Sequence, residues 1–592
     1  MVMKHERKKF LLFDSILLGV VGALGAQLFL YLLHLVMGFS LQDLAGYQAP
    51  GLPNMGESVV EVTHKYSGLI ILGVIVVGAL ISGYLIYTFA PEAEGHGTDT
   101  AVRAFHRTGG RIRWRVTPLK ILASALTIGT GGSAGREGPT ALFSAGIGSI
   151  YATVKNSSNH ERRLLVLIGM AAGLSAIFRA PIGTAIFAIE VLYNDMDFEA
   201  DALVYTLLGS LVAYMVTGFF TGWEPLFIIP KDLMATDLTT FFYLLILGLL
   251  SGILGMILPN LFYGVRDLFH KIRIKPHFKP AIGALGVGLI ALALPQVLGG
   301  GYGWIQKAID GHIVLWMLPV ILIAKMLSFA LTVSSGGSGG VFAPSLFVGA
   351  FLGSFVALLF GQPPAIFAVI GMAAVFGSSA RVPLATLIMV TEMTGGYTLL
   401  APAALTVLIA YLLQSHLVRV LKLKYESLYE GQVPDKSFSP VHQIDKIRKI
   451  LSFYRPQLSL THEEIDQAKM LDMLEASVPI DISEDHQLFF GSLKRRFDLT
   501  VNPGEEHPET IYYKEARVLA VFRDGEWIYP HSATRLNKGD ELLLIGDAEV
   551  IKQIRKDFSA VSKVFSMLIA QVNRNKLHAL QGWYDLVRRK KK

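Results

Sequence analysis

Apolar segments of membrane length recur along the first 418 residues of the chain and constrain its fold more than any other feature. Four of them are Phe10–Val36, Leu69–Ala90, Phe241–Pro259 and Val314–Val333. About 20 consecutive apolar residues span the hydrocarbon core of a bilayer as a helix, which satisfies all its backbone polar groups internally. Charged residues make up only 17% of the chain, against about 25% in soluble domains. We therefore predict a multi-pass α-helical protein in the lipid bilayer.

Positive charge gathers in four clusters beside apolar segments. The clusters lie at 4–9, 103–115, 271–279 and 588–592. Lys and Arg next to membrane segments mark the cytoplasmic side, so we expect both termini in the cytoplasm. The first apolar run is long enough to span the bilayer, so we expect an uncleaved first helix. We also expect a location in a bacterial plasma membrane. Nucleic acid is not an expected partner. The chain has no cysteine, which excludes disulfides and thiolate chemistry, and we expect no metal site.

Composition divides the chain into two regions. The apolar segments end near residue 418, and from Lys436 onward the sequence is polar, with short strand-like runs at Arg517–Phe522 and Glu541–Ile545. We predict a transmembrane domain over residues 1–435. We predict a small cytoplasmic α+β regulatory domain over residues 436–592.

The membrane region contains an internal repeat. Gly169–Leu192 and Gly371–Thr394 match at nine of 24 positions at an offset of 202, and Thr130–Thr140 is similar to Ser335–Ser345 at an offset of 205. The equivalent pairs of charged residues and prolines are Lys120 with Lys325, Arg179 with Arg381, Pro181 with Pro383, and Glu190 with Glu392. Repeated halves with hydrophobic segments interrupted by glycine and proline are typical of secondary-transporter folds. The alternative for the glycine pairs alone is close helix packing through small residues.

Glu137 lies at one of these interruptions, in the motif GREGP between Arg136 and Gly138, with Pro139 suited to the first turn of a helix. Helix N-termini carry unpaired N–H donors and partial positive charge, so converging helix breaks favour an anion. An ionisable group in an apolar membrane segment indicates function. We expect the carboxylate to occupy the place of an anion until protonation releases it. The alternative is a salt bridge to Arg136 or Lys120.

Three motifs carry a resemblance to a known family. APEAEGHG (90–97), GREGP (135–139) and GGVFAP (339–344) resemble the anion-coordinating motifs of the chloride channel/transporter (CLC) family, and the two GMAA segments match its other signatures. The resemblance covers about residues 10–432. It implies a homodimer with one pore per subunit, built from inverted halves at about 60–225 and 235–432. It also implies movement of chloride and protons, no cofactor and no enzymatic activity.

The same resemblance implies which groups bind the anion. Backbone N–H groups around Arg136–Gly138 and at Val341 and Phe342 are expected to bind it, and the hydroxyl of Tyr429 is expected to coordinate the central ion. An interfacial aromatic is the alternative for Tyr429. Tyr425 is a weaker candidate for the same role.

Two positions depart from the family pattern. His96 and Asp99 stand where the family has the serine and the proline of its GSGIP motif. Imidazole donates hydrogen bonds and, free in water, titrates near pH 6.5, so we expect His96 to bind the anion in a pH-dependent way. A ring that points away and is satisfied by the backbone is the alternative. Val191 stands at the position where exchangers often carry an inner proton glutamate, so that acid is absent.

The remaining acids of the repeat region have either a predicted structural role or two alternative roles. Glu190 and Glu392 are expected to be structural, either capping backbone groups or pairing with basic ones. The acids that follow Val191 either serve proton entry from the cytoplasm or form a solvated loop: Asp195, Asp197 and Glu199.

The C-terminal region resembles a second known module. Asn537–Phe558 suggests a turn, a strand, a turn and a helix, and with Arg517–Pro530 it is similar to the C-terminal ligand-binding module of potassium-channel regulatory subunits, the TrkA-C (RCK C-terminal) type. The core is expected at about 475–560. It implies dimerisation and a small effector, such as a nucleotide, although the region has no Gly-rich phosphate loop. A basic helix at about 561–592 is expected either to lie on the membrane surface or to form a solvated tail.

These patterns leave three functions open. The first is chloride transport gated by protonation of Glu137, as a chloride/proton exchanger or a chloride channel. The second is a purely passive proton- or voltage-gated anion channel, regulated by an effector at the cytoplasmic domain, which Val191 favours. The least favoured is transport of another ion: fluoride, nitrate or a cation. The fluoride-exporting branch usually has threonine where Pro139 stands.

Overall fold

The computed structural model describes residues 2–436, except 53, 55–66, 231, 232 and 236, together with residue 439 and segments between 486 and 559. These residues belong to two compact units. The first unit covers 1–105 and 110–436, and the second covers 106–109 and 437–592.

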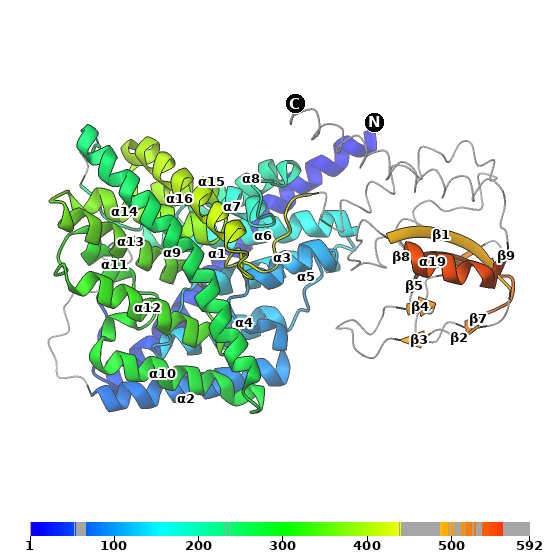
Figure 1. Ribbon diagram of the computed structural model, residues 1–592, viewed down its shortest axis with the longest axis horizontal. Coiled ribbons are helices and arrows are strands. Elements are labelled where there is room, and N and C mark those ends of the chain that lie inside the picture. The colour runs from blue at the N-terminus through cyan, green and yellow to red at the C-terminus, as the bar shows by residue number, and fades with distance from the viewer. Residues whose placement is uncertain are drawn as a thin grey trace. The chain divides into compact units, whose positions relative to one another are not determined.

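The described part of the first unit is a helical bundle whose helices run in two successive halves (Figure 1). The first half contains α1 (Val2–Met37), α2 (Gly68–Phe89), α3 (Thr98–Arg107), α4 (Val116–Gly129), α5 (Glu137–Val154), α6 (Asn159–Phe178), α7 (Pro181–Glu190) and α8 (Leu203–Thr221). The second half contains α9 (Leu238–Lys271), α10 (Lys279–Ala293), α11 (Tyr302–Ile309), α12 (Met317–Ser334), α13 (Phe342–Leu359), α14 (Pro364–Ser379), α15 (Pro383–Thr394) and α16 (Leu400–Val420). Short 3₁₀ or π segments adjoin them: η1 (Gly38–Leu44), η3 (Pro91–Ala93), η4 (Ala200–Ala202), η5 (Pro276–Phe278), η6 (Pro295–Val297) and η7 (Tyr397–Leu399).

The two halves pack alike. Helix α1 packs on α8 as α9 packs on α16, and α5 packs on α6 as α13 packs on α14. Helices α7 and α15 pack on each other, and α2 lies beside α10 along one edge of the bundle (Figure 1). The repeat in the sequence is therefore also a repeat in the packing. We infer that α1 is the counterpart of α9, so the first half begins earlier than residue 60.

Glycine lets the backbones of paired helices touch. A Cβ atom on Gly148 of α5 would lie 2.1 Å from the carbonyl oxygen of Leu165 on α6. One on Gly353 of α13 would lie 1.9 Å from the carbonyl oxygen of Phe367 on α14. Both distances are far inside van der Waals contact, so only glycine fits. In lipid, such close packing replaces the hydrophobic drive that helices have in water.

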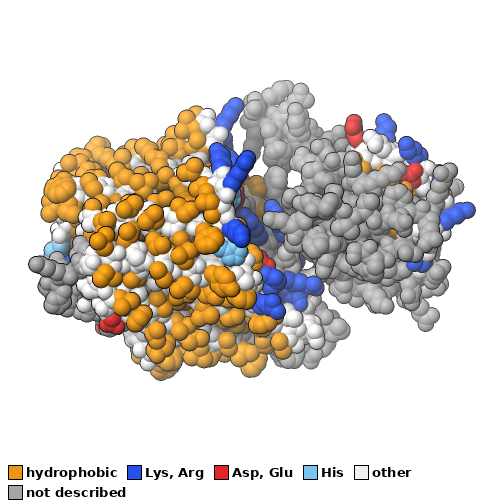
Figure 2. Space-filling model, turned by 90° about the horizontal axis from the view of Figure 1, so that it is seen from below, with side chains coloured by type: hydrophobic (Ala, Val, Ile, Leu, Met, Phe, Trp, Pro, Cys, Tyr) orange, Lys and Arg blue, Asp and Glu red, His pale blue; other side chains and the backbone are white. Residues whose placement is uncertain are grey.

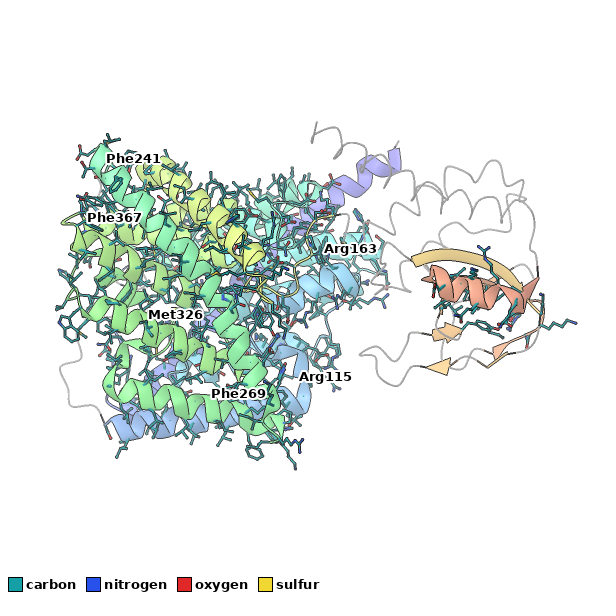
Figure 3. The ribbon with its side chains drawn as sticks, viewed as in Figure 1. Arg115, Arg163, Phe241, Phe269, Met326 and Phe367 are labelled. Atoms are coloured by element: carbon teal, nitrogen blue, oxygen red, sulfur yellow. The ribbon has the colours of Figure 1, made fainter. Side chains whose placement is uncertain are left out.

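The first unit has the surface of a membrane protein. Eight helical segments of the described chain are long and apolar enough to cross a bilayer. Figure 2 shows hydrophobic side chains over most of the described surface of this unit, with Lys and Arg gathered along one edge. Figure 3 shows Phe241 and Phe367 towards one end of the bundle and Arg115 and Arg163 towards the opposite end. The predicted multi-pass membrane protein is confirmed.

Glu190 and Glu392 join the two halves by capping each other's helices. Glu190, at the end of α7, accepts hydrogen bonds from the backbone N–H groups of Leu384 (3.1 Å) and Ala385 (2.6 Å) at the start of α15. Glu392, near the end of α15, accepts from the N–H groups of Ile182 (3.1 Å) and Gly183 (2.7 Å) at the start of α7. A carboxylate at a helix N-terminus satisfies donors that have no partner within the helix. The expectation that both acids are structural caps is confirmed.

The second unit contains short strands around one small core. They are β1 (His486–Leu493), β2 (Phe497–Asp498), β3 (Thr500–Val501), β4 (Ile511–Tyr513), β5 (Ala516–Arg523), β6 (Glu526–Ile528), β7 (Arg535–Leu536), β8 (Glu541–Asp547) and β9 (Phe558–Ser559). The sheet order is β3-β4-β5-β8-β1-β9, all antiparallel, with β6 on β5, while β2 pairs with β7. Strand β8 leads into α19 (Ala548–Ile554), and η9 (Arg555–Asp557) follows. Leu542 and Leu544 of β8 pack with Ile551 of α19 in the core. The predicted helix at 561–592 lies outside the described residues, as does part of the predicted 475–560 core.

Candidate functional site

Three interrupted segments of the first unit meet at the start of two helices. Gly135, just before α5, and Gly340, just before α13, form a two-bond bridge, with N–O distances of 2.8 Å and 2.6 Å. The N–H group of Gly339 also donates to the carbonyl of Gly95, in the loop before α3, at 3.2 Å. The motifs at 90–97, 135–139 and 339–344 are thus brought together, as the sequence predicts.

Glycine is needed where these segments touch. A Cβ atom on Gly138 would lie 2.1 Å from the carbonyl oxygen of His96 and 2.8 Å from the Cα atom of Gly340. Gly97 has a φ of +85°, and a Cβ atom there would lie 2.9 Å from the carbonyl oxygen of Gly138. The three segments therefore pack backbone against backbone. Their first N–H groups, which have no partner one turn earlier in a helix, converge on one small region.

Glu137 is buried at this convergence, with 1% of its surface exposed. A Cβ atom on Gly135 would lie 2.2 Å from the Oε2 atom of Glu137 and 3.1 Å from the backbone nitrogen of Ala343. The carboxylate therefore folds back over Gly135, between the N-termini of α5 and α13. Neither of its oxygens has a hydrogen-bond partner among the described residues.

The two cations that the sequence offered as partners of Glu137 are held by other groups. Lys120 donates to the carbonyls of Ala93 (2.9 Å) and Gly95 (2.8 Å), which fixes the loop that carries His96. Its repeat partner Lys325 makes the equivalent bonds in the second half, to the carbonyls at 297 (2.9 Å) and 299 (2.7 Å). The guanidinium group of Arg136 lies over the ring of Tyr302, 4.3 Å from its centre. The salt-bridge alternative does not describe this arrangement.

His96 and Tyr429 face each other beside the convergence, with ring centres 5.5 Å apart. The Nε2 atom of His96 lies 3.2 Å from Oδ2 of Asp99, and its buried Nδ1 atom has no hydrogen-bond partner among the described residues. The ring is therefore not satisfied by the backbone. Tyr429 is only 3% exposed, so it is not an interfacial aromatic. The hydroxyl of Tyr425 donates to Asp267 at 2.6 Å, which engages it away from His96.

Aromatic rings close the space around Tyr429. Phe342, the first residue of α13, packs against Phe178 and Phe376 with ring centres 4.3 Å and 4.2 Å away. The ring of Phe187 lies 6.2 Å from that of Tyr429 and 6.4 Å from that of Phe342. Burial raises the pKa of the Tyr429 phenol and the Asp99 charge acts in the same direction, so the hydroxyl remains a hydrogen-bond donor.

The acids that follow Val191 agree only in part with the prediction of a solvated loop. Val191 is fully buried at the end of α7 and offers no acid. The side chain of Asp195 is 58% exposed, and Asp197 accepts a hydrogen bond from the backbone of Lys436. Glu199, however, is buried and accepts a hydrogen bond from the hydroxyl of Tyr193. The solvated-loop alternative therefore holds for Asp195 and is wrong for Glu199.

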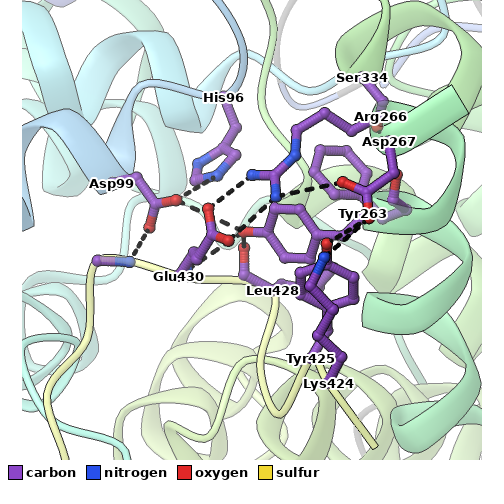
Figure 4. Close-up of polar contacts among 12 residues, drawn as sticks. His96, Asp99, Tyr263, Arg266, Asp267, Ser334, Lys424, Tyr425, Leu428 and Glu430 are labelled. Carbon is purple, nitrogen blue, oxygen red and sulfur yellow. Dashed lines mark hydrogen bonds and ion pairs between the residues drawn. The ribbon is translucent and has the colours of Figure 1, made fainter. Parts of the chain in front are cut away.

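A polar cluster that the sequence did not reveal surrounds Asp99 (Figure 4). The hydroxyl of Tyr263 lies 3.4 Å from Oδ2 of Asp99 and donates to the carbonyl of Leu428 at 2.8 Å. The N–H group of Gly431 donates to Oδ1 of Asp99 at 3.0 Å, and Glu430 pairs with Arg266 at 2.6 Å. These residues come from α9 and from the segment after α16. For Leu428, Glu430 and Gly431 the one signal in the sequence was their nearness to Tyr429, and the sequence held no such signal for Tyr263 and Arg266.

Comparison with known proteins bears on the family. Residues 78–415 match the family described as voltage gated chloride channel. The H(+)/Cl(-) exchange transporter ClcA of Salmonella agona is 33% identical over 351 residues, which are 57% of this chain and 74% of that protein. ClcA of Salmonella paratyphi B is 32% identical over the same shares.

Two solved structures share the fold. A slow cyanobacterial Cl⁻/H⁺ antiporter has a TM-score of 0.61 at 23% identity, covering 71% of this chain and 96% of the other. A CLC-type fluoride/proton antiporter has a TM-score of 0.60 at 24% identity, covering 72% of this chain and 98% of the other. The family match spans more than half of the chain and includes the converging motifs at 90–97, 135–139 and 339–344. The chain therefore belongs to the voltage-gated chloride channel (CLC) family.

Proposed function

We propose that the protein exchanges chloride for protons across the membrane, with Glu137 as the residue that gates the anion and carries the proton. The observation that carries this proposal is the place of its carboxylate, buried at the convergence of α5 and α13 with no hydrogen-bond partner among the described residues. An anionic group there uses the field of two helix N-termini, which also favours a chloride ion. The carboxylate and the ion therefore compete for one place.

The anion is bound mainly by backbone groups. The N–H groups around Arg136–Gly138 and at Val341 and Phe342 surround the region that the carboxylate occupies, because α5 and α13 start there. His96 and Tyr429 supply side-chain donors on one side of it. Protonation of Glu137 removes its charge, so the side chain leaves and chloride takes its place. Each time chloride replaces the carboxylate, Glu137 holds a proton, so anion movement is coupled to proton movement.

Exchange is preferred over a passive channel because the matched ClcA relatives are exchange transporters by name. A passive proton- or voltage-gated channel is the second candidate, and the observation in its favour is Val191, which leaves no acid at the inner proton position. Chloride is preferred to fluoride because Pro139 stands where the fluoride-exporting branch usually has threonine.

The wider organisation completes the proposal. The protein works as a homodimer in a bacterial plasma membrane, with both termini in the cytoplasm. Basic residues such as Arg115 and Arg163, which share one end of the bundle, support this orientation. The region at about 475–560 acts as a TrkA-C-like regulatory domain that binds a small effector. Neither a cofactor nor an enzymatic reaction is part of this function.

Proteoliposomes holding an outward chloride gradient test the exchange. We expect the purified full chain to drive protons uphill as chloride flows down its gradient, with the internal pH measured by a fluorescent dye. Glu137→Gln keeps the size of the side chain but cannot release a proton, so we expect proton movement to disappear while chloride still flows, without pH dependence. Chloride flow without uphill protons in the unsubstituted protein would support the channel instead. No chloride flow at all would refute both.

A further inference from the structure

The pairing of His96 with Asp99 supplies a proton site where Val191 does not. The Nε2 atom of His96 lies 3.2 Å from a carboxylate oxygen, which only accepts hydrogen bonds, so Nε2 carries a hydrogen. In the neutral ring, Nδ1 then has a free lone pair. This Nδ1 atom is buried, and the described residues offer it no hydrogen-bond partner. The site therefore holds an unused proton acceptor beside Tyr429.

A series of polar groups leads from the His96–Asp99 pair towards the surface. The exposed fraction of the side chain rises from 7% at His96 to 13% at Asp99 and 36% at Glu430. The hydroxyl of Tyr263 stands between the last two, 3.4 Å from Asp99 and 3.2 Å from the backbone nitrogen of Glu430 (Figure 4). The pair is thus connected to the surface side by polar groups that do not include Glu137.

Several charged and titratable groups surround the pair, and Asp99 is the one in direct contact with the ring. The titratable groups that face it are Asp99 and Arg103 of α3, Lys120 of α4, Glu137 of α5, Tyr263 of α9, and Tyr429 and Glu430 after α16. Lys120 is held by backbone carbonyls, and Glu430 is paired with Arg103 and Arg266. Asp99 is the nearest charge to the imidazole. A carboxylate at hydrogen-bond distance stabilises an imidazolium ion.

We propose that the His96–Asp99 pair is the inner proton site of the exchange cycle and that it takes up its proton together with the anion. This inference rests on the exchange proposed above. A hydrated proton gives up its O–H bond as Nδ1 of His96 forms an N–H bond. The new N–H group donates to chloride beside the hydroxyl of Tyr429, and Asp99 balances the positive ring. When chloride moves on, the N–H bond breaks and water carries the proton to the carboxylate of Glu137.

The first test measures proton uptake on chloride binding and needs no transport. In a Glu137→Gln background the gating acid cannot titrate. We expect this protein in weakly buffered detergent at pH 7 to take up protons when sodium chloride is added, and its chloride affinity to fall as the pH rises, because the two effects are linked. Adding His96→Gln keeps a polar side chain but removes the proton acceptor. We expect uptake to fall at least fivefold and the affinity to lose its pH dependence.

The matched control and a second variant keep this test decisive. His312 lies in an exposed loop, so His312→Gln in the same background should take up protons like the parent. Asp99→Asn removes the balancing charge and should shift proton uptake to lower pH. Equal proton uptake with and without His96 would overturn the proposal, even if the protein exchanges ions.

Transport measurements then distinguish this inference from the proposed chloride/proton exchange on which it rests. In proteoliposomes we expect His96→Gln alone to lose uphill proton movement at least tenfold more than it loses chloride flow, so the number of protons moved per chloride falls. Unchanged proton coupling in this variant would overturn the inference while exchange through Glu137 stands. Chloride flow without uphill protons in the unsubstituted protein would overturn the exchange itself, and with it an inner proton site in the cycle.

Discussion

At the scale of single residues, Gly138 is the position of the candidate site that tolerates least change. A methyl group there would lie 2.1 Å from the carbonyl oxygen of His96. Gly138→Ala must therefore push the loop before α3 away from α5, and such overpacking costs about 1–3 kcal/mol. Since about 1.4 kcal/mol is a factor of ten, we expect chloride flux in proteoliposomes to fall about tenfold or more.

Gly264 offers a matched control for this substitution. It lies inside α9, and nothing stands within 4 Å of a Cβ atom placed on it. Gly264→Ala should leave flux unchanged and raise stability slightly, because alanine favours a helix over glycine by about 1 kcal/mol. Equal loss of flux in both variants would mean that the close contact of Gly138 is not what holds the site.

The carboxyl group of Asp99 gives a second prediction at the scale of single residues. Asp99 lies in α3, which is not one of the membrane spans. Burial alone would raise the pKa of its carboxyl, but His96, Arg103 and the N–H group of Gly431 outweigh it and lower the pKa below its usual range. A lowered pKa means that Asp99 stabilises the fold above the pKa of the unfolded chain, about 3.9, and that this stability is lost as the pH falls through the folded-state value.

Thermal unfolding in detergent from pH 3 to pH 7 checks this sign. Asp99→Asn should lower the melting temperature at pH 7, and the difference from the unsubstituted protein should shrink as the pH falls below about 4. A difference that stays constant across this range would show that the charge of Asp99 does not contribute.

The residues of the site were predictable to different degrees. Glu137 could be found from sequence alone, because an acid in an apolar membrane segment is rare and the repeat marks the helix break. His96 and Tyr429 could be found only through the family motifs. The partners of Asp99 could not, because Tyr263 is far away along the chain and reaches Asp99 only through the crossing of α9 over the bundle.

At the scale of elements, the exchanged caps of Glu190 and Glu392 hold the two halves together. Each carboxylate receives two backbone N–H groups from the helix of the other half. Glutamine has one acceptor oxygen, and its amide N–H would face a second donor. We expect Glu190→Gln and Glu392→Gln each to lower the free energy of unfolding by about 2 kcal/mol, since hydrogen bonds to charged groups contribute about 1.5–3 kcal/mol.

Chemical unfolding in detergent, followed by tryptophan fluorescence, measures this loss. The control is Glu92→Gln, which breaks an exposed pair with Arg113. Exposed pairs contribute about 0–1 kcal/mol, so this variant should stay close to the unsubstituted protein. If all three substitutions cost the same, the caps would not be a specific bond between the halves.

The elements themselves were largely predictable, whereas their pairing was not. The two GMAA segments predicted equivalent stretches of helix, and these are α6 with α7 and α14 with α15. That Glu190 reaches α15 rather than its own half could not be predicted, since a repeat in sequence does not say how the copies face each other. Helix α1 resembles α9 in packing and not in motif, so the repeated motifs do not mark it as part of the first half.

At the scale of the whole molecule, the segment between α16 and Lys436 belongs to the membrane unit and completes its site. It carries Tyr429, and its Gly431 caps Asp99 at 3.0 Å. The membrane unit therefore needs the chain as far as Lys436 and has its own core without the rest. A chain ending at Lys436 should retain chloride flux, whereas a chain ending at Lys422 should lose it.

Flux in proteoliposomes, measured at equal protein amounts after gel filtration shows a single folded species, distinguishes the two lengths. The longer chain should run at a rate within about threefold of the full protein if the region beyond 436 only regulates transport, since a factor of three is under 1 kcal/mol. The shorter chain lacks the hydroxyl of Tyr429 and leaves Asp99 uncapped, so its loss should be at least tenfold. Loss of flux in both would make the C-terminal region part of the transport machinery. Retention in both would remove Tyr429 from the anion site and leave the anion to the backbone groups around Glu137.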